Sequence, residues 1–193
     1  MAKIFLETAR LRLREFSMDD VDHIVALDSD PEVMRYISFG APTPRETIVT
    51  RVLPSWLKYY GNNERNGFWA AELKSTGEFI GWFHLRPDRF DAGEQELGYR
   101  VRRDMWRHGF ATEGSRALLQ DGFIISQFPK ITARTLLANV GSQRVMQKCG
   151  LQFETEFIYP EHMLRGGTEE MRRAVKYSAL RNQWLTNMQS PAL

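Results

Sequence analysis

The first third of the chain shows a strand pattern followed by a helix pattern. Residues 8–14 alternate between polar and apolar positions, which predicts a half-buried strand with its leucines facing the core. Ser17 and Asp20 have the spacing of a capping box, and apolar residues at helical intervals follow them. This helix is expected to stop before Pro31, because the residue preceding a proline avoids the helical conformation.

A second helix pattern starts near Thr43 and carries apolar residues as far as Tyr60. Thr43 is the expected N-cap, Pro44 the first helical residue and Glu46 the residue that closes the capping box. Pro54 lies inside this stretch, and a proline removes a helical hydrogen bond, so a kink or a break is expected there.

The remainder of the chain predicts strands interrupted by two helices. The expected strands cover residues 68–73, 79–85, 96–101, 131–137, 153–159 and 171–180. The expected helices cover residues 109–128 and 142–149, the second ended by Gly150, and a turn at Arg165, Gly166 and Gly167 separates the last two strands. On the first of these helices the candidate buried residues are Phe110, Ala117, Leu118, Ile124, Ile125 and Phe128. This order of elements is typical of a mixed α/β sheet with helices packed on it.

Length and composition narrow the class of protein. A chain of 193 residues fits one domain, so we expect residues 1–193 to form a single domain. Lys and Arg number 26 and Asp and Glu 24, and a net charge of +2 argues against bulk attraction to nucleic acid or to an anionic membrane. The single cysteine, Cys149, excludes an internal disulfide, and we expect a buried, inert thiol. The charged N-terminus and the lack of a long apolar run lead us to expect a cytoplasmic protein.

Three arginines stand on the polar face of the first strand. Arg10, Arg12 and Arg14 form either a solvated row or a grip for an acidic partner. Nucleic-acid binding through this row is the least favoured function, and a steep salt dependence of binding would reveal it.

A basic loop leads into the helix expected at residues 109–128. Residues 100–107 contain four arginines and one aspartate, and the small residues Gly109 and Ala111 follow. The first backbone N–H groups of a helix are unpaired and lie at the positive end of its dipole, so small residues there let an anion approach. The segment is therefore either a pyrophosphate site or an ordinary connection with a solvated loop.

Four short motifs occur in order around this helix start. Residues 106–113 read WRHGFATE and are preceded by ELGY at residues 96–99. Further on, NVGS at residues 139–142 runs to KCGL at residues 148–151. In this order and spacing the motifs resemble those of the GNAT superfamily of N-acetyltransferases, the first being similar to its acyl-CoA-binding motif.

The N-terminal part resembles one branch of that superfamily. Residues 8–14 and 29–36 are similar to the RimJ/RimL-type branch, and the likeness extends over most of the chain. Trp106 stands at the first position of the acyl-CoA loop, as is frequent in this branch. Met146 stands where many members carry a tyrosine general acid, so a phenol at that position is excluded.

The resemblance implies a fold and a co-substrate. The implied fold is a central, mostly antiparallel sheet of about seven strands, splayed between the fourth and the fifth and flanked by about four helices. Acetyl-CoA is the implied co-substrate, its pantetheine arm pairing with the open backbone of the fourth strand, and no metal is implied. The residues assigned to it by motif position are Tyr99, Val101, Arg102, Arg107, His108, Gly109, Phe110, Ala111, Thr112, Asn139 and Ser142.

The resemblance also implies that a primary amine attacks the thioester directly while both substrates are bound. Such a reaction needs a group that takes a proton from the amine and one that helps the thiolate to leave. Glu96 is the candidate base, and its other interpretation is a surface or ion-paired carboxylate. Ser142 is the candidate acid, and its position also fits a helix N-cap.

Two oppositely charged segments lie close together in the chain. Residues 88–96 contain four carboxylates and one arginine, and the basic segment 100–107 follows. We hypothesise a polarised cleft whose acidic end, with Asp88 and Asp91, attracts a cationic amine. The alternative is two loops that are simply solvated.

The sequence leaves the amine and one other function open. The acceptor is a protein N-terminus, an amino acid or peptide, a polyamine or an aminoglycoside. The alternative function is a non-catalytic module that binds or senses acyl-CoA, and thiol release across a panel of amines would separate the two. The expected partners are acetyl-CoA and an amine, without nucleic acid or membrane, for a monomer or a homodimer.

Overall fold

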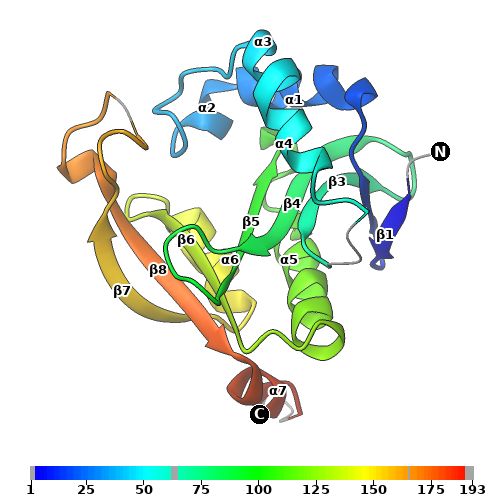
Figure 1. Ribbon diagram of the computed structural model, residues 1–193, viewed down its shortest axis with the longest axis vertical. Coiled ribbons are helices and arrows are strands. Elements are labelled where there is room, and N and C mark those ends of the chain that lie inside the picture. Colours follow the sequence, from blue (N-terminus) through cyan, green and yellow to red (C-terminus); the bar gives the residue numbers. More distant parts are fainter. Residues whose placement is uncertain (1–2, 62–64, 165, 190–193) are drawn as a thin grey trace.

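A computed structural model describes residues 3–61, 65–164 and 166–189, and within these ranges the strands form one mixed eight-stranded sheet (Figure 1). The strand order is β1-β2-β3-β4-β5-β6-β8-β7. The strands are β1 (Ile4–Glu7), β2 (Leu11–Glu15), β3 (Gly67–Leu73), β4 (Phe79–Pro87), β5 (Gln95–Val101), β6 (Lys130–Leu136), β7 (Gln152–Ile158) and β8 (Arg173–Leu180).

Helices cover both faces of the sheet. The first group is α1 (Val21–Ser29), α2 (Pro31–Met34), α3 (Arg45–Thr47) and α4 (Leu53–Leu57). The second group is α5 (Phe110–Gln120), α6 (Val140–Lys148) and α7 (Arg181–Gln189). Figure 1 shows α1–α4 gathered at one end of the sheet, away from α5. Each group encloses its own apolar core, because adjacent strand residues point to opposite faces: Trp69 belongs to the core with α5–α7, and Ala70 to the core with α1–α4.

The sheet opens between β5 and β6. These two strands run parallel and are joined through only two residue pairs, Gln95 with Ile131 and Glu96 with Thr132. Beyond Glu96 the strands diverge, whereas β5 stays paired with β4 along its whole length. The expected splay is therefore confirmed, and it lies between β5 and β6 because β1 adds one strand ahead of the expected series.

The predicted N-terminal caps have different outcomes. Ser17 and Asp20 form the capping box that the spacing predicts, and α1 ends at Ser29 as expected. The Thr43 N-cap is wrong, because Pro44 holds the N-cap position and the Thr43 hydroxyl donates to Asp28 at 2.7 Å.

Both long helices accommodate an irregular turn of π-helix. Residues 48–52 form one such turn just before Pro54, which relieves the hydrogen bond that the proline removes. The helix after Gly109 ends in a second one, at residues 121–125. A π-helical turn contains more residues than an α-helical turn, so it changes which side chains face the core, and Phe123 is buried. Ile124 and Ile125 are 44% and 60% exposed, so their expected burial is wrong.

Three elements were not expected from the sequence, the strand β1 and the helices α2 and α7. β1 is short and its alternation is too weak to distinguish it from a loop, and α7 presents only Trp184 to the core. The turn expected at Arg165 falls on a residue outside the described ranges. No helix among the described residues is long and apolar enough to cross a membrane.

Candidate active site

Strand β5 leaves part of its backbone without a strand partner. In an antiparallel pair only alternate residues hydrogen-bond to the neighbouring strand. The Arg102 N–H donates to the Ile80 carbonyl at 2.8 Å, so the even-numbered residues of β5 face β4. The main-chain groups of Leu97, Tyr99 and Val101 therefore point toward the side where β6 has diverged. Tyr99 and Val101 are two of the residues that the family resemblance assigns to acetyl-CoA.

Two glycines fix the start of helix α5 beside this open edge. Gly109 is the N-cap and has a φ of 84°, a left-handed conformation that strains any other residue. Gly114 lies against β4, where a Cβ atom would come within 2.4 Å of the Phe83 ring. Since this contact holds the helix close to the sheet, the unpaired N–H groups of residues 110–112 lie near the end of β5.

The loop before the helix is tied down by its own side chains. The Trp106 indole N–H donates to the Val101 carbonyl at 2.8 Å, which occupies one main-chain group of the open edge. The His108 Nδ1 atom lies 2.8 Å from the Trp106 carbonyl, and its ring stacks on Phe110. Arg107, between them, has a φ of 65°, a conformation rare for a residue with a side chain. The tryptophan thus has a structural reason to stand at the first position of this loop.

Most arginines of the basic loop already have a carboxylate partner. Arg102 lies 2.6 Å from Glu78, and Arg103 lies 3.0 Å from Asp30. Arg107 has no carboxylate partner among the residues that the structure describes. The contribution of Arg102 to phosphate binding stays a prediction, and Arg107 has the less occupied guanidinium of the two.

A depression of about 600 Å³ beside α5 adds two cations that the sequence did not single out. It is lined by one face of α5, including Gly109 and Thr112, together with Arg116 and Lys148. Arg116 also donates to the Lys148 carbonyl at 2.6 Å, which joins α5 to the end of α6. Helical spacing places Thr112 and Arg116 on one face, a signal present in the sequence, but Lys148 joins them only through tertiary packing.

Tyr99, Ser142 and Asn139 meet on the α5–α7 face of the sheet. The Tyr99 hydroxyl lies 2.9 Å from the Ser142 Oγ atom and 3.2 Å from the Ser142 carbonyl. Burial raises the pKa of Tyr99, so the phenol keeps its proton. Asn139 is the N-cap of α6 and accepts from the Ser142 N–H at 3.1 Å, so the N-cap interpretation of Ser142 is wrong. The Tyr99 phenol beside Ser142 is a feature that the sequence did not reveal.

Glu96 lies on the opposite face of β5, toward α1–α4. Its side chain is almost completely buried, forms an ion pair with Arg86 of β4 and has a second guanidinium, that of Arg134, at 3.8 Å. Burial raises the pKa of Glu96, and the two arginines only partly offset the effect. The ion-paired interpretation is thus observed, and the raised pKa gives this carboxylate a higher proton affinity than an ordinary glutamate has.

Cys149 is inert at neutral pH. It is 3% exposed, its thiol lies 3.7 Å from the Thr112 carbonyl, and burial raises its pKa to about 12. Because the thiolate is the nucleophilic form, the expected buried and unreactive thiol is confirmed.

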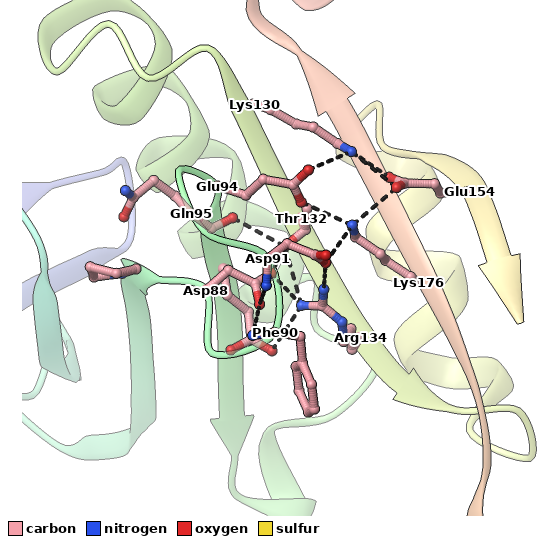
Figure 2. A network of polar contacts seen from close by, with 12 residues as sticks. Asp88, Phe90, Asp91, Glu94, Gln95, Lys130, Thr132, Arg134, Glu154 and Lys176 are labelled. Carbon is pink, nitrogen blue, oxygen red and sulfur yellow. Dashed lines mark hydrogen bonds and ion pairs between the residues drawn. The ribbon is translucent and has the colours of Figure 1, made fainter. Parts of the chain in front are cut away.

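The acidic segment forms a network of ion pairs in place of the hypothesised acidic end of a cleft (Figure 2). Asp88 is ion-paired with Arg134, and Asp91 accepts from Arg134 at 2.5 Å and from Lys176 at 2.8 Å. Glu94 lies 2.9 Å from Lys176 as well. The three carboxylates are close enough together to hold a cation, but basic side chains already occupy them. The polarised-cleft hypothesis is therefore wrong in its acidic half, because basic side chains neutralise these carboxylates. The sequence could not show this pairing, because the basic partners lie far away in the chain.

The arginine row, which consists of Arg10 just before β2 and of Arg12 and Arg14 in β2, is also paired with carboxylates. Arg10 lies 2.6 Å from Glu113 of α5, and Arg12 lies 3.0 Å from Glu7. The partly buried Arg14 pairs with carboxylates on both sides. The row is neither simply solvated nor left open for an acidic partner.

Comparisons with known proteins agree with this geometry. Residues 10–152 match the family model described as acetyltransferase (GNAT) domain. The FsC-acetyl coenzyme A-N(2)-transacetylase of Aspergillus fumigatus is 31% identical over 196 residues, which cover 97% of this chain and 80% of that protein. Among solved structures, a GNAT-family acetyltransferase from Bacillus anthracis superposes with a TM-score of 0.74 at 23% identity, over 93% of this chain and 99% of the other. The spermidine N-acetyltransferase of Vibrio cholerae, in complex with CoA and spermine, gives a TM-score of 0.72 at 18% identity, over 92% and 99%.

Proposed function

This chain belongs to the GNAT acetyltransferase family, and we propose that it transfers an acetyl group from acetyl-CoA to a primary amine by direct attack while both substrates are bound. The observation that carries the proposal is the opening between β5 and β6. It gives one strand an unpaired edge, with Glu96 on one face of the sheet and Ser142 on the other. The segments 8–14 and 29–36 support an assignment to the RimJ/RimL-type branch.

Acetyl-CoA fits the chain's own groups along this opening. The main-chain groups of Tyr99 and the N–H of Val101 are oriented to receive an extended pantetheine arm as an added strand. The N-terminus of α5, with Gly109 at its cap, suits the pyrophosphate, because no side chain of the described residues makes a capping hydrogen bond to its first N–H groups. Arg107, Arg116 and Lys148 supply positive charge on the same side.

Ser142 is the proposed proton donor to the leaving sulfur. Its hydroxyl oxygen has the Tyr99 phenol as a neighbour at 2.9 Å. Either hydroxyl can donate in this contact, and when the protonated phenol donates to the serine oxygen, the serine hydrogen is free to point at the leaving sulfur. The pair therefore takes the place of the tyrosine that Met146 replaces.

Glu96 is the proposed base on the amine side. It lies where β5 and β6 part, and burial raises its pKa, so it accepts a proton more readily than an exposed glutamate. Arg86 and Arg134 hold its carboxylate in place. A water molecule suffices to carry the proton from the amine to this carboxylate.

Thiol release tests the function. The protein is incubated with acetyl-CoA and a panel of amines, and the thiol is measured with a chromogenic disulfide. Release that depends on the amine is the expected result. Binding of CoA without thiol release for any amine would instead identify a non-catalytic binding module.

The Ser142→Ala substitution tests the proton donor. We expect kcat to fall by about 10²-fold, the usual contribution of a general acid. The Kd of acetyl-CoA by calorimetry should stay within about twofold, because the main-chain contacts remain, and Tyr99→Phe should act in the same direction. Ser126→Ala, at the far end of the α5 segment, is the control. A change in affinity alone would remove the role of acid from Ser142.

The Glu96→Gln substitution tests the base through the pH profile. The wild-type rate should fall as the pH drops through the pKa of Glu96, which lies above its usual 4.5, because only the ionised carboxylate accepts a proton. The variant should lose this acidic limb together with most of its kcat. If the limb persists in the variant, another group is the base.

A further inference from the structure

Four polar side chains form a row on the face of the sheet that is turned toward α1–α4. Trp82, His84 and Arg86 alternate along β4, and Arg100 stands on β5 directly opposite Trp82. Arg86 stands opposite Glu96, the residue at which β5 and β6 part. The row thus runs beside the opening in the sheet, on the side of the proposed base.

Each of these four residues, together called the donor row, has at least one buried polar atom without a hydrogen-bond partner among the described residues. These atoms are the Trp82 Nε1, the Nε atoms of Arg86 and Arg100, and both ring nitrogens of His84. Buried polar groups in proteins are nearly always paired, so five unpaired atoms on adjacent positions require an explanation. Water or a ligand that lies along the row would complete them.

The unpaired atoms are mostly donors. An indole N–H and a guanidinium Nε–H donate only. Burial and the charges of nearby arginines hold the pKa of His84 well below its usual value, so the ring is neutral and offers one donor and one acceptor. Four donors therefore stand against one acceptor.

The carboxylates on the same face are already occupied. Glu96 is ion-paired with Arg86, and Asp28 is ion-paired with Arg100 and accepts from Thr43. The positive and negative charges of these two pairs cancel. The unpaired donors on this face therefore require an acceptor oxygen. A ligand without net charge supplies one and leaves the charge balance of the face unchanged.

His84 brings the row close to the open edge. Its ring lies on the backbone of Gly98, where a Cβ atom would come within 2.4 Å of the imidazole. Gly98 is one residue before Tyr99, whose main chain faces the opening. A ligand atom that reaches the donor row is thus within one residue of the strand edge proposed to hold the thioester.

Resting on the proposed function, we infer that the acceptor amine is of the amino-acid type, with a carboxylate next to its reacting nitrogen. The carboxylate takes hydrogen bonds from the donor row, where guanidinium donors make strong, charge-assisted bonds. The amine then lies on the side of Glu96. A polyamine in its protonated form offers only donors, and the row leaves it a single lone pair to bind.

Matched amines provide the test. The kcat/KM for thiol release is measured for L-phenylalanine, L-histidine, L-tryptophan and L-lysine, for their decarboxylated amines and their amides, and for spermidine. We expect at least one amino acid to exceed its decarboxylated partner by tenfold or more. The inference is overturned if decarboxylated amines or spermidine are preferred, and also if the amides equal the acids, which would indicate a peptide N-terminus.

Two conservative variants locate the effect in the row. Trp82→Phe removes the indole N–H and keeps an aromatic ring, and Arg100→Lys keeps the charge beside Asp28. Each should reduce the preference for the carboxylate about tenfold, the usual effect of losing one hydrogen bond to a charged group. Arg12→Lys on β2, whose guanidinium pairs with Glu7, should leave the preference unchanged. If the two row variants lose kcat/KM equally for the amino acid and for its decarboxylated amine, the row has a purely structural role and the inference is overturned.

A binding measurement separates this inference from the proposed function. In the presence of CoA, N-acetylamino acids should raise the Tm of the protein, and the matching N-acetylamines should not. If no amine releases thiol but this difference is seen, the proposed catalysis fails, and the inferred binding of a carboxylate at the donor row stands. If neither class raises the Tm, the inference fails, whatever the thiol assay shows.

Discussion

The role of a charged residue in this chain depends on the residue with which it is paired. The side chain of Asp88 is fully buried, accepts from the Thr132 hydroxyl at 2.7 Å and is ion-paired with Arg134, which is 3% exposed. A buried pair of this kind adds little over an apolar pair, yet removing one partner leaves a charge without compensation. The residue therefore acts in stability, although its position in an acidic segment indicated a role in attracting substrate.

The first prediction concerns that pair. Asp88→Asn should lower the free energy of unfolding by about 2 kcal/mol, because Arg134 loses its fully buried carboxylate partner and keeps only the partly exposed Asp91 and the more distant Glu96. Urea denaturation at neutral pH measures it. Asp91→Asn is the matched control and should have a smaller effect, since the Asp91 side chain is 43% exposed. Equal losses for the two variants would contradict the assignment.

At the scale of elements, helix α5 links the core of the molecule to the candidate active site. Its middle packs on β4 through Gly114, and its N-terminus supplies the proposed pyrophosphate site. Ionic contacts with Arg10, the residue before β2, and a hydrogen bond from Arg116 to α6 hold its two sides. A change in the packing of its middle is therefore transmitted to its N-terminus, because the helix moves as one body.

The second prediction concerns this helix. In Gly114→Ala the new Cβ lies 2.4 Å from the Phe83 ring, so the helix or the ring must shift. Overpacking costs about 1–3 kcal/mol and the helix preference of alanine returns up to about 1 kcal/mol, so we expect a net loss of about 1–2 kcal/mol in unfolding free energy. The Kd of acetyl-CoA should rise as well.

A double-mutant cycle is the control for this prediction. In Gly114→Ala combined with Phe83→Leu, the smaller side chain gives the new methyl group room. The combined loss should be smaller than the sum of the single losses. Additive losses would mean that the two positions do not clash.

At the scale of the molecule, an ionic network joins the two parts of the opened sheet. The β4–β5 loop contributes Glu94, and its partners are Lys130 of β6 and Lys176 of β8, which also bind Glu154 of β7 (Figure 2). Since only two residue pairs connect β5 with β6, this network reinforces the junction at the closed end of the opening. Its carboxylates must stay ionised for this role.

The third prediction is the acid sensitivity of that junction. Burial alone would raise the pKa of Glu154, but hydrogen bonds from Ser178, Lys130 and Lys176 lower it to about 2, against 4.5 unfolded. Between these values the unfolded chain binds more protons, so stability is lost as the pH falls through them. Glu154→Gln should be less stable than the wild type at pH 7, and the difference should narrow as the pH falls from about 4.5 to about 2.

Denaturation at several pH values measures this effect. The control is Glu170→Gln, because the Glu170 side chain is 76% exposed although it pairs with Arg173. The difference in unfolding free energy between Glu170→Gln and the wild type should change little with pH. If the Glu154→Gln difference also stays constant, this carboxylate does not contribute to the acid sensitivity.

The sequence by itself determined the order of most elements, the family and the strand edge of the candidate site. Alternation along β2 and glycines such as Gly109 act locally, through the period of the strand and through backbone sterics, so a linear pattern can carry them. Element ends were less predictable where a distant group decided them. Thr43, for example, donates to Asp28 and not to its own helix, and a turn of π-helix moved Ile124 and Ile125 into solvent.

Only the tertiary structure decided which charges and polar groups are free. It paired Asp88 with Arg134, brought the Tyr99 phenol to Ser142, and aligned Trp82 with Arg100 beside the opening. Each of these depends on residues that are far apart in the chain and meet at one register of the sheet. Electrostatic and hydrogen-bond energies depend on distance and burial, and neither quantity is present in a linear pattern of residues.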